Sequence, residues 1–251
     1  MTTDVDATAS WIERAAERSP SVQRSRTRSV QRAQQIVEAA RRLAETRGSD
    51  FTTHELVKEA GIAVKTFYKH FEGKDHVLLA VLEELISEAC ANLEIAGRKL
   101  PDPIARLKFY ITSIVSTISA GPTDGRPRFI TSEHWRLHQL YPAELAQATG
   151  GFTRLLLPEV QAATEAGLLR PSNPDYDSWL ITQLIIVVFH HYEYAPHTES
   201  AGVIGERLWS FCYAALGGQS ETETTETETE TTETETTETE TAHVTTRRRA
   251  K

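Results

Sequence analysis

The stretch from residue 52 to residue 79 constrains the fold most, because two glycines divide it into segments whose apolar residues have helical spacing. Gly61 follows a short apolar segment, and glycine adopts the left-handed conformation that ends a helix at little cost. The next segment, 65–71, places Phe67 and Phe71 four residues apart, so both face one side of a helix. Two short helices joined by a glycine turn are typical of helix-turn-helix readers of DNA.

From Arg32 to Leu85 the chain resembles the DNA-binding domain of TetR-type transcriptional regulators. The residues that carry the resemblance are Phe51-Thr52-Thr53, Ala60-Gly61-Ile62, Thr66-Phe67-Tyr68-Lys69-His70-Phe71, Gly73-Lys74-Asp75 and Leu78-Leu79. The family usually has Ser at the position of Ala63 and often at that of Gly73. The resemblance implies an all-α fold, in which an N-terminal three-helix helix-turn-helix domain is joined by a connecting helix to a C-terminal helical domain for ligand binding and dimerisation.

Composition and helix-breaking residues divide the chain into four parts. We predict a flexible extension, a helix-turn-helix DNA-binding domain, a helical effector-binding and dimerisation domain, and a disordered Glu/Thr-rich tail with a basic end, over residues 1–28, 29–76, 77–217 and 218–251. Within the DNA-binding domain, helices are expected over 29–47 and 65–71. The second domain is expected to be helical throughout, since every segment between its Gly and Pro clusters has helical periodicity.

The charge is unevenly distributed. The chain carries a net charge of -8, yet residues 21–76 hold 11 Lys/Arg and 7 Asp/Glu, a net +4. The tail from residue 219 to residue 251 holds 9 Glu and 4 Lys/Arg. The alternating Arg24, Arg26 and Arg28 indicate either an arm that contacts phosphates or a minor groove, or a solvated leader. The tail either binds basic surfaces of the chain or is simply solvated.

Several classes of protein are disfavoured. No apolar run approaches the roughly 20 residues of a membrane span, and the N-terminus lacks the apolar region of a signal peptide. Two distant cysteines, Cys90 and Cys212, fit a reducing cytoplasm better than a disulfide framework. Because no nucleophile elbow, Gly-rich phosphate loop or paired-cysteine motif occurs, we expect neither an enzyme nor a bound cofactor.

The residues expected to contact DNA lie on the second short helix and at the starts of its neighbours, where cations and hydroxyls can reach base edges and phosphates. They are Thr53, Lys65, Thr66, Tyr68, Lys69, His70 and Lys74.

The second domain is expected to hold a small-molecule effector in a largely apolar pocket with a few polar groups. The candidate lining residues are Phe109, Tyr110, Ile114, His134, Trp135, Phe152, Leu156, Gln183, Phe189 and His190. An alternative is a metal site, since His134 and His138 lie four apart beside Glu133, and a second helix carries His190, His191 and Glu193. We favour the apolar pocket, because histidine pairs on helices are more often polar surface or pocket groups.

The segment from residue 179 to residue 189 is apolar nearly all round, so part of it is expected to meet another molecule. The last two helices then form a four-helix bundle across a two-fold axis. The candidate dimerisation residues are Trp179, Leu180, Leu184, Val187, His191, Leu208 and Trp209.

The sequence therefore predicts a cytoplasmic, homodimeric regulator of transcription, a repressor that binds a palindromic double-stranded operator and is released by a hydrophobic effector. Two alternatives stay open, a regulator that needs a corepressor and a regulator that responds to a metal.

Overall fold

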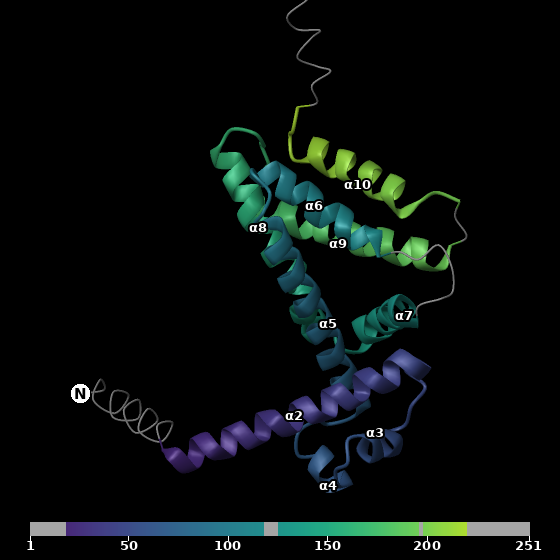
Figure 1. Cartoon of the computed structure of the whole chain (residues 1–251). Coiled ribbons are helices and arrows are strands. Elements are labelled where there is room, and N and C mark those ends of the chain that lie inside the picture. Colours follow the sequence, from purple (N-terminus) through teal and green to yellow (C-terminus); the bar gives the residue numbers. More distant parts are fainter. Residues whose placement is uncertain (1–18, 118–124, 196–197, 220–251) are drawn as a thin grey trace, which may run out of the picture. The chain divides into compact units, whose positions relative to one another are not determined.

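The computed structural model describes residues 19–117, 125–195 and 198–219. Within these residues every regular element is a helix, which confirms the all-α prediction (Figure 1). Most of the predicted extension and nearly all of the predicted tail lie outside the described residues. The helices are α2 (Pro20–Arg47), α3 (Thr53–Glu59), α4 (Val64–Phe67), α5 (Lys74–Gly97), α6 (Pro103–Ser116), α7 (Gly125–Leu140), α8 (Pro142–Glu165), α9 (Pro174–Tyr194) and α10 (Ala201–Ala215).

The chain divides into two compact units. Unit 1 comprises Met1–Asn92, Ile118–Phe152 and His190–His197, and unit 2 comprises Leu93–Thr117, Thr153–Phe189 and Thr198–Lys251. The predicted domain boundary between residues 76 and 77 falls inside unit 1. The reason is packing, because the first turns of α5 bury Val77 and Leu78 completely in the core that also holds the helix-turn-helix.

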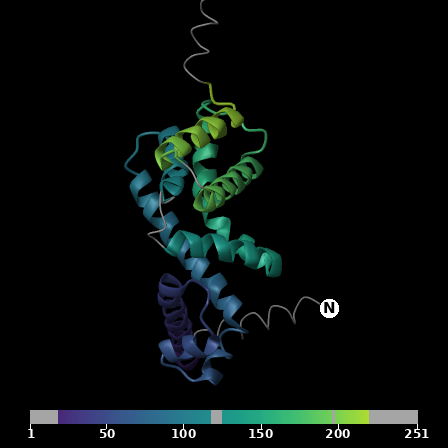
Figure 2. The ribbon, with the colours of Figure 1, turned by 90° about the vertical axis from the view of Figure 1, so that its right-hand side faces the viewer.

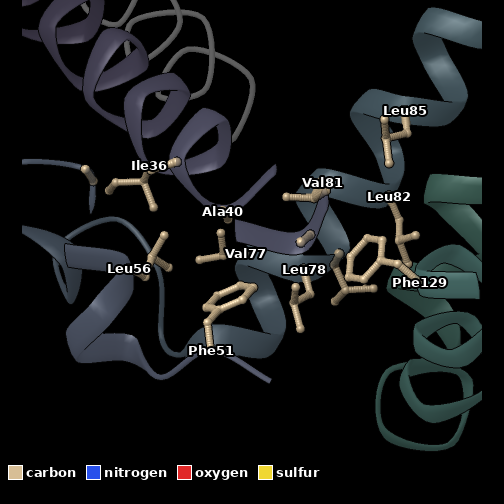
Figure 3. Close-up of a cluster of buried hydrophobic side chains, with 14 of the residues drawn as sticks. Ile36, Ala40, Phe51, Leu56, Val77, Leu78, Val81, Leu82, Leu85 and Phe129 are labelled. Carbon is tan, nitrogen blue, oxygen red and sulfur yellow. The ribbon is translucent and has the colours of Figure 1, made fainter. Parts of the chain in front are cut away.

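Unit 1 is organised around one apolar cluster (Figure 3). Ile36 and Ala40, four residues apart on α2, face Leu56 of α3 and Phe51 of the preceding loop. From α5, the cluster receives Val77, Leu78, Val81 and Leu82, and from α7 it receives Phe129. Burying one such side chain contributes roughly 1.5–3 kcal/mol, whereas helices as short as α3 and α4 are marginal alone. The cluster therefore holds the two short helices in place.

Helix α2 begins at Pro20 and not near residue 29, so Arg24, Arg26 and Arg28 lie on a helix and not in a flexible arm. Ser19 occupies the N-cap position with an extended backbone, and Pro20 is the first helical residue. Proline is favoured there because its fixed φ suits the helix and its missing N–H would have no partner. Ser19-Pro20 therefore starts this helix.

In unit 2, α6 and α10 lie side by side (Figures 1 and 2). Gly205 of α10 approaches α6 so closely that a Cβ there would lie 3.5 Å from the Thr112 Cα. An ion pair of 2.8 Å between Lys108 Nζ and the Glu206 carboxylate joins the same two helices. Cys212 is fully buried, and burial raises the pKa of its thiol to about 12, so it stays protonated at neutral pH.

Candidate functional site

The first reader helix, α3, has a complete capping box. The Thr52 hydroxyl accepts a hydrogen bond of 3.2 Å from the Glu55 backbone N–H, and the Glu55 carboxylate accepts one of 2.8 Å from the Thr52 N–H. The Thr52 backbone N–H is also the main reason why the pKa of Glu55 lies below its usual value. Gly61 then turns the chain with φ +63, a conformation that residues with a Cβ rarely adopt. These two devices fix where α3 begins and ends.

The second reader helix, α4, is shorter than the predicted 65–71. The Tyr68 N–H bonds four residues back to the Val64 carbonyl, and the Lys69 and His70 N–H groups then bond three residues back. The Phe71 N–H again bonds four residues back, to the Phe67 carbonyl. The segment continues through these tighter turns as far as Phe71. Ala63 stands at the N-cap and supplies no side-chain hydrogen bond, so packing holds this helix.

Packing decides which side of α4 is presented to solvent. Phe67 is fully buried, whereas Lys65, Tyr68 and Lys69 are exposed. The ring of Tyr68 stands edge-on to that of Phe67, with centroids 5.1 Å apart, so its phenol is positioned although it is 58% exposed. Among the other predicted DNA contacts, Thr53, Thr66 and His70 are half-buried.

Lys74 is the predicted DNA contact that the structure places differently. Its ammonium donates hydrogen bonds of 2.7 Å to the Ser49 carbonyl and 3.1 Å to the Phe51 carbonyl. It also lies 5.4 Å from the centre of the Phe51 ring, within the range of a cation–π contact. Two of its three N–H donors are therefore used inside the domain. We assign Lys74 a structural role in place of the expected phosphate contact.

Replacing Lys74 with methionine is expected to lower the free energy of unfolding by about 1.5–3 kcal/mol, because two backbone carbonyls lose a charged donor. Urea denaturation of this variant and of Lys69→Met, which removes an exposed lysine of the same domain, measures the difference. A Lys74→Met variant as stable as the wild type but weaker in DNA binding would restore the phosphate role.

An ionic network that the sequence did not reveal connects α5 with α7. Arg136 of α7 donates a hydrogen bond of 2.8 Å to Asp75 at the start of α5, and bonds of 2.9 and 2.7 Å to Glu133. The hydrogen bond from Arg136 is the main reason why the pKa of Asp75 lies below its usual value. Glu133 is only 2% exposed. The network ties the beginning of α5, directly after the reader helices, to α7.

Three of the predicted effector residues come together in unit 1. The rings of His134 and His190 lie 4.7 Å apart, and that of Trp135 lies 5.8 Å from His190. Burial lowers the pKa of each of these two histidines to about 4, so both are neutral at physiological pH. The Trp135 side chain is 52% exposed beside them. Neutral imidazoles next to an exposed indole can orient a polar group of a mainly apolar ligand.

The remaining predicted lining residues divide between the two units. Phe152 belongs to unit 1 and is half-buried. In unit 2, Tyr110 and Leu156 are fully buried. Tyr110 packs so closely on α5 that a Cβ at Gly97 would clash with its ring, so we assign it to the core. The half-buried candidates of unit 2 are Phe109, Ile114, Gln183 and Phe189.

The predicted dimerisation residues also differ in exposure. Most of those on α9 present apolar surface, since Trp179, Leu180 and Val187 are between 44% and 53% exposed. Leu184 is half-buried and His191 is exposed. Leu208 and Trp209 of α10 differ from the prediction, because both side chains are already buried within their own unit.

Neither a metal site nor a membrane span is found within the described residues. No group of three or more His, Cys, Asp or Glu side chains in that part of the chain is placed to hold a metal ion. None of its helices combines the length and the apolar character that crossing a lipid bilayer requires.

Comparison with known proteins identifies the N-terminal domain. Residues 36–81 match the family model of bacterial regulatory proteins, tetR family. The HTH-type transcriptional regulator EthR of Mycolicibacterium smegmatis is 31% identical over 93 residues, which are 36% of this chain and 43% of EthR. The chain thus spans less than half the length of this curated relative.

Solved structures resemble the chain over a longer range. The transcriptional regulator FadR from Bacillus subtilis, in complex with stearoyl-CoA, has a TM-score of 0.59 at 14% identity, over 73% of this chain and 98% of that one. Thermus thermophilus FadR, a TetR-family transcriptional repressor in complex with lauroyl-CoA, has a TM-score of 0.60 at 16% identity, over 73% and 94%. At such identities the likeness establishes a shared fold.

A capped helix-turn-helix with an exposed cationic reader helix, followed by a second helical domain, is the architecture of a DNA-binding regulator. The matched segment, residues 36–81, runs from the second half of α2 through α3 and α4 into α5, so the similarity to the tetR family of bacterial regulatory proteins lies in the helix-turn-helix.

Proposed function

We propose that this chain is a cytoplasmic transcriptional regulator that binds a palindromic operator as a homodimer and responds to a small hydrophobic effector. The observation that carries the proposal is the exposed face of α4. Lys65, Tyr68 and Lys69 extend into solvent from a turn that the buried Phe67 holds rigidly. Cationic and phenolic groups on a reader helix are suited to base edges and phosphate oxygens.

The proposed homodimer supplies two readers. Two-fold symmetry places the readers on successive major grooves, about 34–36 Å apart, and this spacing predicts the palindrome. The exposed apolar side chains of α9 support an interface there, since single exposed apolar residues are common but several on one helix are not.

The effector that we propose is a largely hydrophobic, acyl-type compound. Aromatic and aliphatic side chains predominate among the candidate lining residues, and His134 and His190 are neutral at physiological pH. The two FadR proteins of similar fold bind stearoyl-CoA and lauroyl-CoA. The metal-responsive alternative has no supporting cluster among the described residues.

We propose that the chain is a repressor and that effector binding favours a helix arrangement in which the two readers no longer fit successive grooves. The route that we infer within unit 1 runs along α7, from His134 and Trp135 to Arg136 and then to Asp75. A corepressor would act through the same contacts with the opposite effect, because it would favour the spacing at which the two readers bind DNA.

The test begins with selection of genome fragments by the purified protein, followed by footprinting of the enriched site at two salt concentrations. We expect a protected palindrome whose affinity falls as salt rises. Lys69→Ala is expected to weaken binding about tenfold, a change within the range for the removal of one side chain that touches DNA.

Lys99→Ala is the charge-matched control, since this exposed lysine follows α5 and lies outside the helix-turn-helix. Its affinity should equal that of the wild type. A failure to enrich any fragment, with and without acyl-CoA compounds, would contradict the proposed function. Equal reductions in affinity for both variants would mean that α4 does not read DNA.

A further inference from the structure

The N-terminal half of α2 is charged and exposed, and it contributes no buried residue to the helix-turn-helix domain. Residues 20–32 are exposed on every side. They include four arginines, and no acidic residue occurs in α2 before Glu38. Such a segment buries no apolar surface, so its composition points to a partner of opposite charge.

The two halves of α2 differ in whether their arginines form ion pairs. In the C-terminal half, Arg41, Arg42 and Arg47 each form an ion pair, with shortest N–O distances between 2.8 and 3.0 Å. Their partners are the glutamates Glu88, Glu59 and Glu55.

In the N-terminal half, the hydrogen bonds found for the arginines go to neutral groups. Arg24 donates to the Pro20 carbonyl of its own helix, and Arg32 donates to the side-chain amide of Gln35. Within the described residues, no carboxylate lies within ion-pair distance of Arg24, Arg26, Arg28 or Arg32. The positive charge of this half is therefore available to an external anion.

Helical geometry places three of the four arginines on one face. Arg24, Arg28 and Arg32 follow one another at intervals of four residues, and at 3.6 residues per turn they form one row, which we call the arginine stripe. Arg26 falls on the opposite side of the helix. Gln35, three residues after Arg32, continues the stripe.

The row that carries the stripe meets the reader helices at its C-terminal end, through Gln35. The Gln35 side-chain amide donates a hydrogen bond of 2.6 Å to the Ala60 carbonyl, at the end of α3 and directly before the turn into α4. This bond places the row that carries the stripe beside the end of α3, next to the buried face of α2 formed by Ile36, Ala39 and Ala40. Figure 1 shows the N-terminal half of α2 continuing past α4, where it is covered by no other described segment.

We propose that the arginine stripe binds backbone phosphates of the duplex that flanks the sequence read by α4. This inference rests on the proposed function. At 1.5 Å per residue, residues 20–33 reach about 20 Å, and the guanidinium groups lie about one helical turn apart. A duplex carries one negative charge per roughly 1.7 Å of its axis, so phosphates lie within reach of each arginine. Arginine is well suited to this contact, because its planar fork can hold two phosphate oxygens.

Phosphate contacts add affinity and salt dependence without sequence preference. The test compares Arg28→Ala, on the stripe, with Arg26→Ala, which removes the same charge from the opposite face. Alanine favours the helix more than arginine does, so both variants keep α2 helical, and circular dichroism checks this. Operator affinity is measured at four salt concentrations for the wild type, both variants and the triple variant Arg24→Ala/Arg28→Ala/Arg32→Ala.

We expect Arg28→Ala to reduce the slope of log affinity against log salt by about 0.9 for each phosphate that is no longer neutralised, with a similar reduction on scrambled DNA. The triple variant should show a larger reduction, and Arg26→Ala should match the wild type. Equal slopes for Arg28→Ala and Arg26→Ala would overturn the inference and leave the proposed function intact. A rise in DNA affinity on substitution would also overturn the inference, because the stripe would then bind the chain's own Glu-rich segment, 219–241. Failure of the wild-type protein to select any operator would overturn both this inference and the proposed function.

Discussion

Replacing Arg136 with alanine is expected to lower the free energy of unfolding by about 3 kcal/mol. Its guanidinium donates two hydrogen bonds to the carboxylate of Glu133, whose side chain is 3% exposed. Alanine leaves that carboxylate buried without these donors, and breaking a buried pair in this way costs about 3–5 kcal/mol. We expect the lower end of the range, because the guanidinium itself is 38% exposed. Chemical denaturation of the purified variant measures the change.

The control for Arg136→Ala is the double variant Glu133→Gln/Arg136→Ala. It removes the buried charge together with its partner, so part of the stability should return. Asp75→Asn leaves the Arg136–Glu133 pair in place and should cost only about 1 kcal/mol. A destabilisation below about 1 kcal/mol for Arg136→Ala would show that the network is not structural.

The stabilisation by Asp75 depends on pH in a defined direction. The pKa of Asp75 in the folded chain is lower than its usual value, first because of the hydrogen bond from Arg136. The folded state therefore binds the proton less well than the unfolded state, and stability rises with pH across this interval. The Asp75 contribution is complete above a pH of about 4 and disappears as the pH falls through the folded-state pKa.

Replacing Trp179 with aspartate is expected to convert a dimer into a monomer and to abolish high-affinity operator binding. Trp179 is 44% exposed and stacks on Tyr176, which is 56% exposed, with ring centroids 5.4 Å apart. Aromatic residues at the centre of an interface each contribute about 2 kcal/mol or more, and a buried unpaired carboxylate adds a further cost. The mass in solution and footprinting of the palindrome measure the two effects.

Leu140→Asp is a matched control for Trp179→Asp. Leu140 is a similarly exposed apolar side chain, at 53%, and it lies on α7, outside the predicted interface. This variant should keep the mass and the footprint of the wild type. An unchanged mass for Trp179→Asp would remove this part of α9 from the interface.

The sequence predicted the positions of helices well wherever a buried face produces apolar residues at helical spacing. Ile36, Ala39, Ala40 and Ala44 are the buried residues of α2, and they repeat at helical spacing. The first half of the same helix escaped prediction for the corresponding reason. It has no buried face, so it has no period, and Ser19-Pro20 reads equally well as a helix end and as a helix start.

The site was predictable only where neighbours in sequence are also neighbours in space. Exposure of Lys65 and Lys69 follows from their positions relative to Phe67 on one turn. The partners of Lys74 lie 23 and 25 residues away, and Asp75 and Arg136 are 61 residues apart. No local pattern encodes pairings of this kind. Periodicity also cannot separate a core residue such as Trp209 from an interface residue, since both are apolar and similarly spaced.

The buried and the exposed residues of the segment around α4 differ in their contribution to stability, and this difference affects how the chain can evolve. Phe67 lies in the shared core, while Lys65, Tyr68 and Lys69 are mostly surrounded by solvent. Substitutions at such exposed positions usually change stability by less than about 0.5 kcal/mol. Under the proposed function, stability and DNA reading reside in different residues of one short turn, so mutation can change the operator that is bound without first having to rescue the fold.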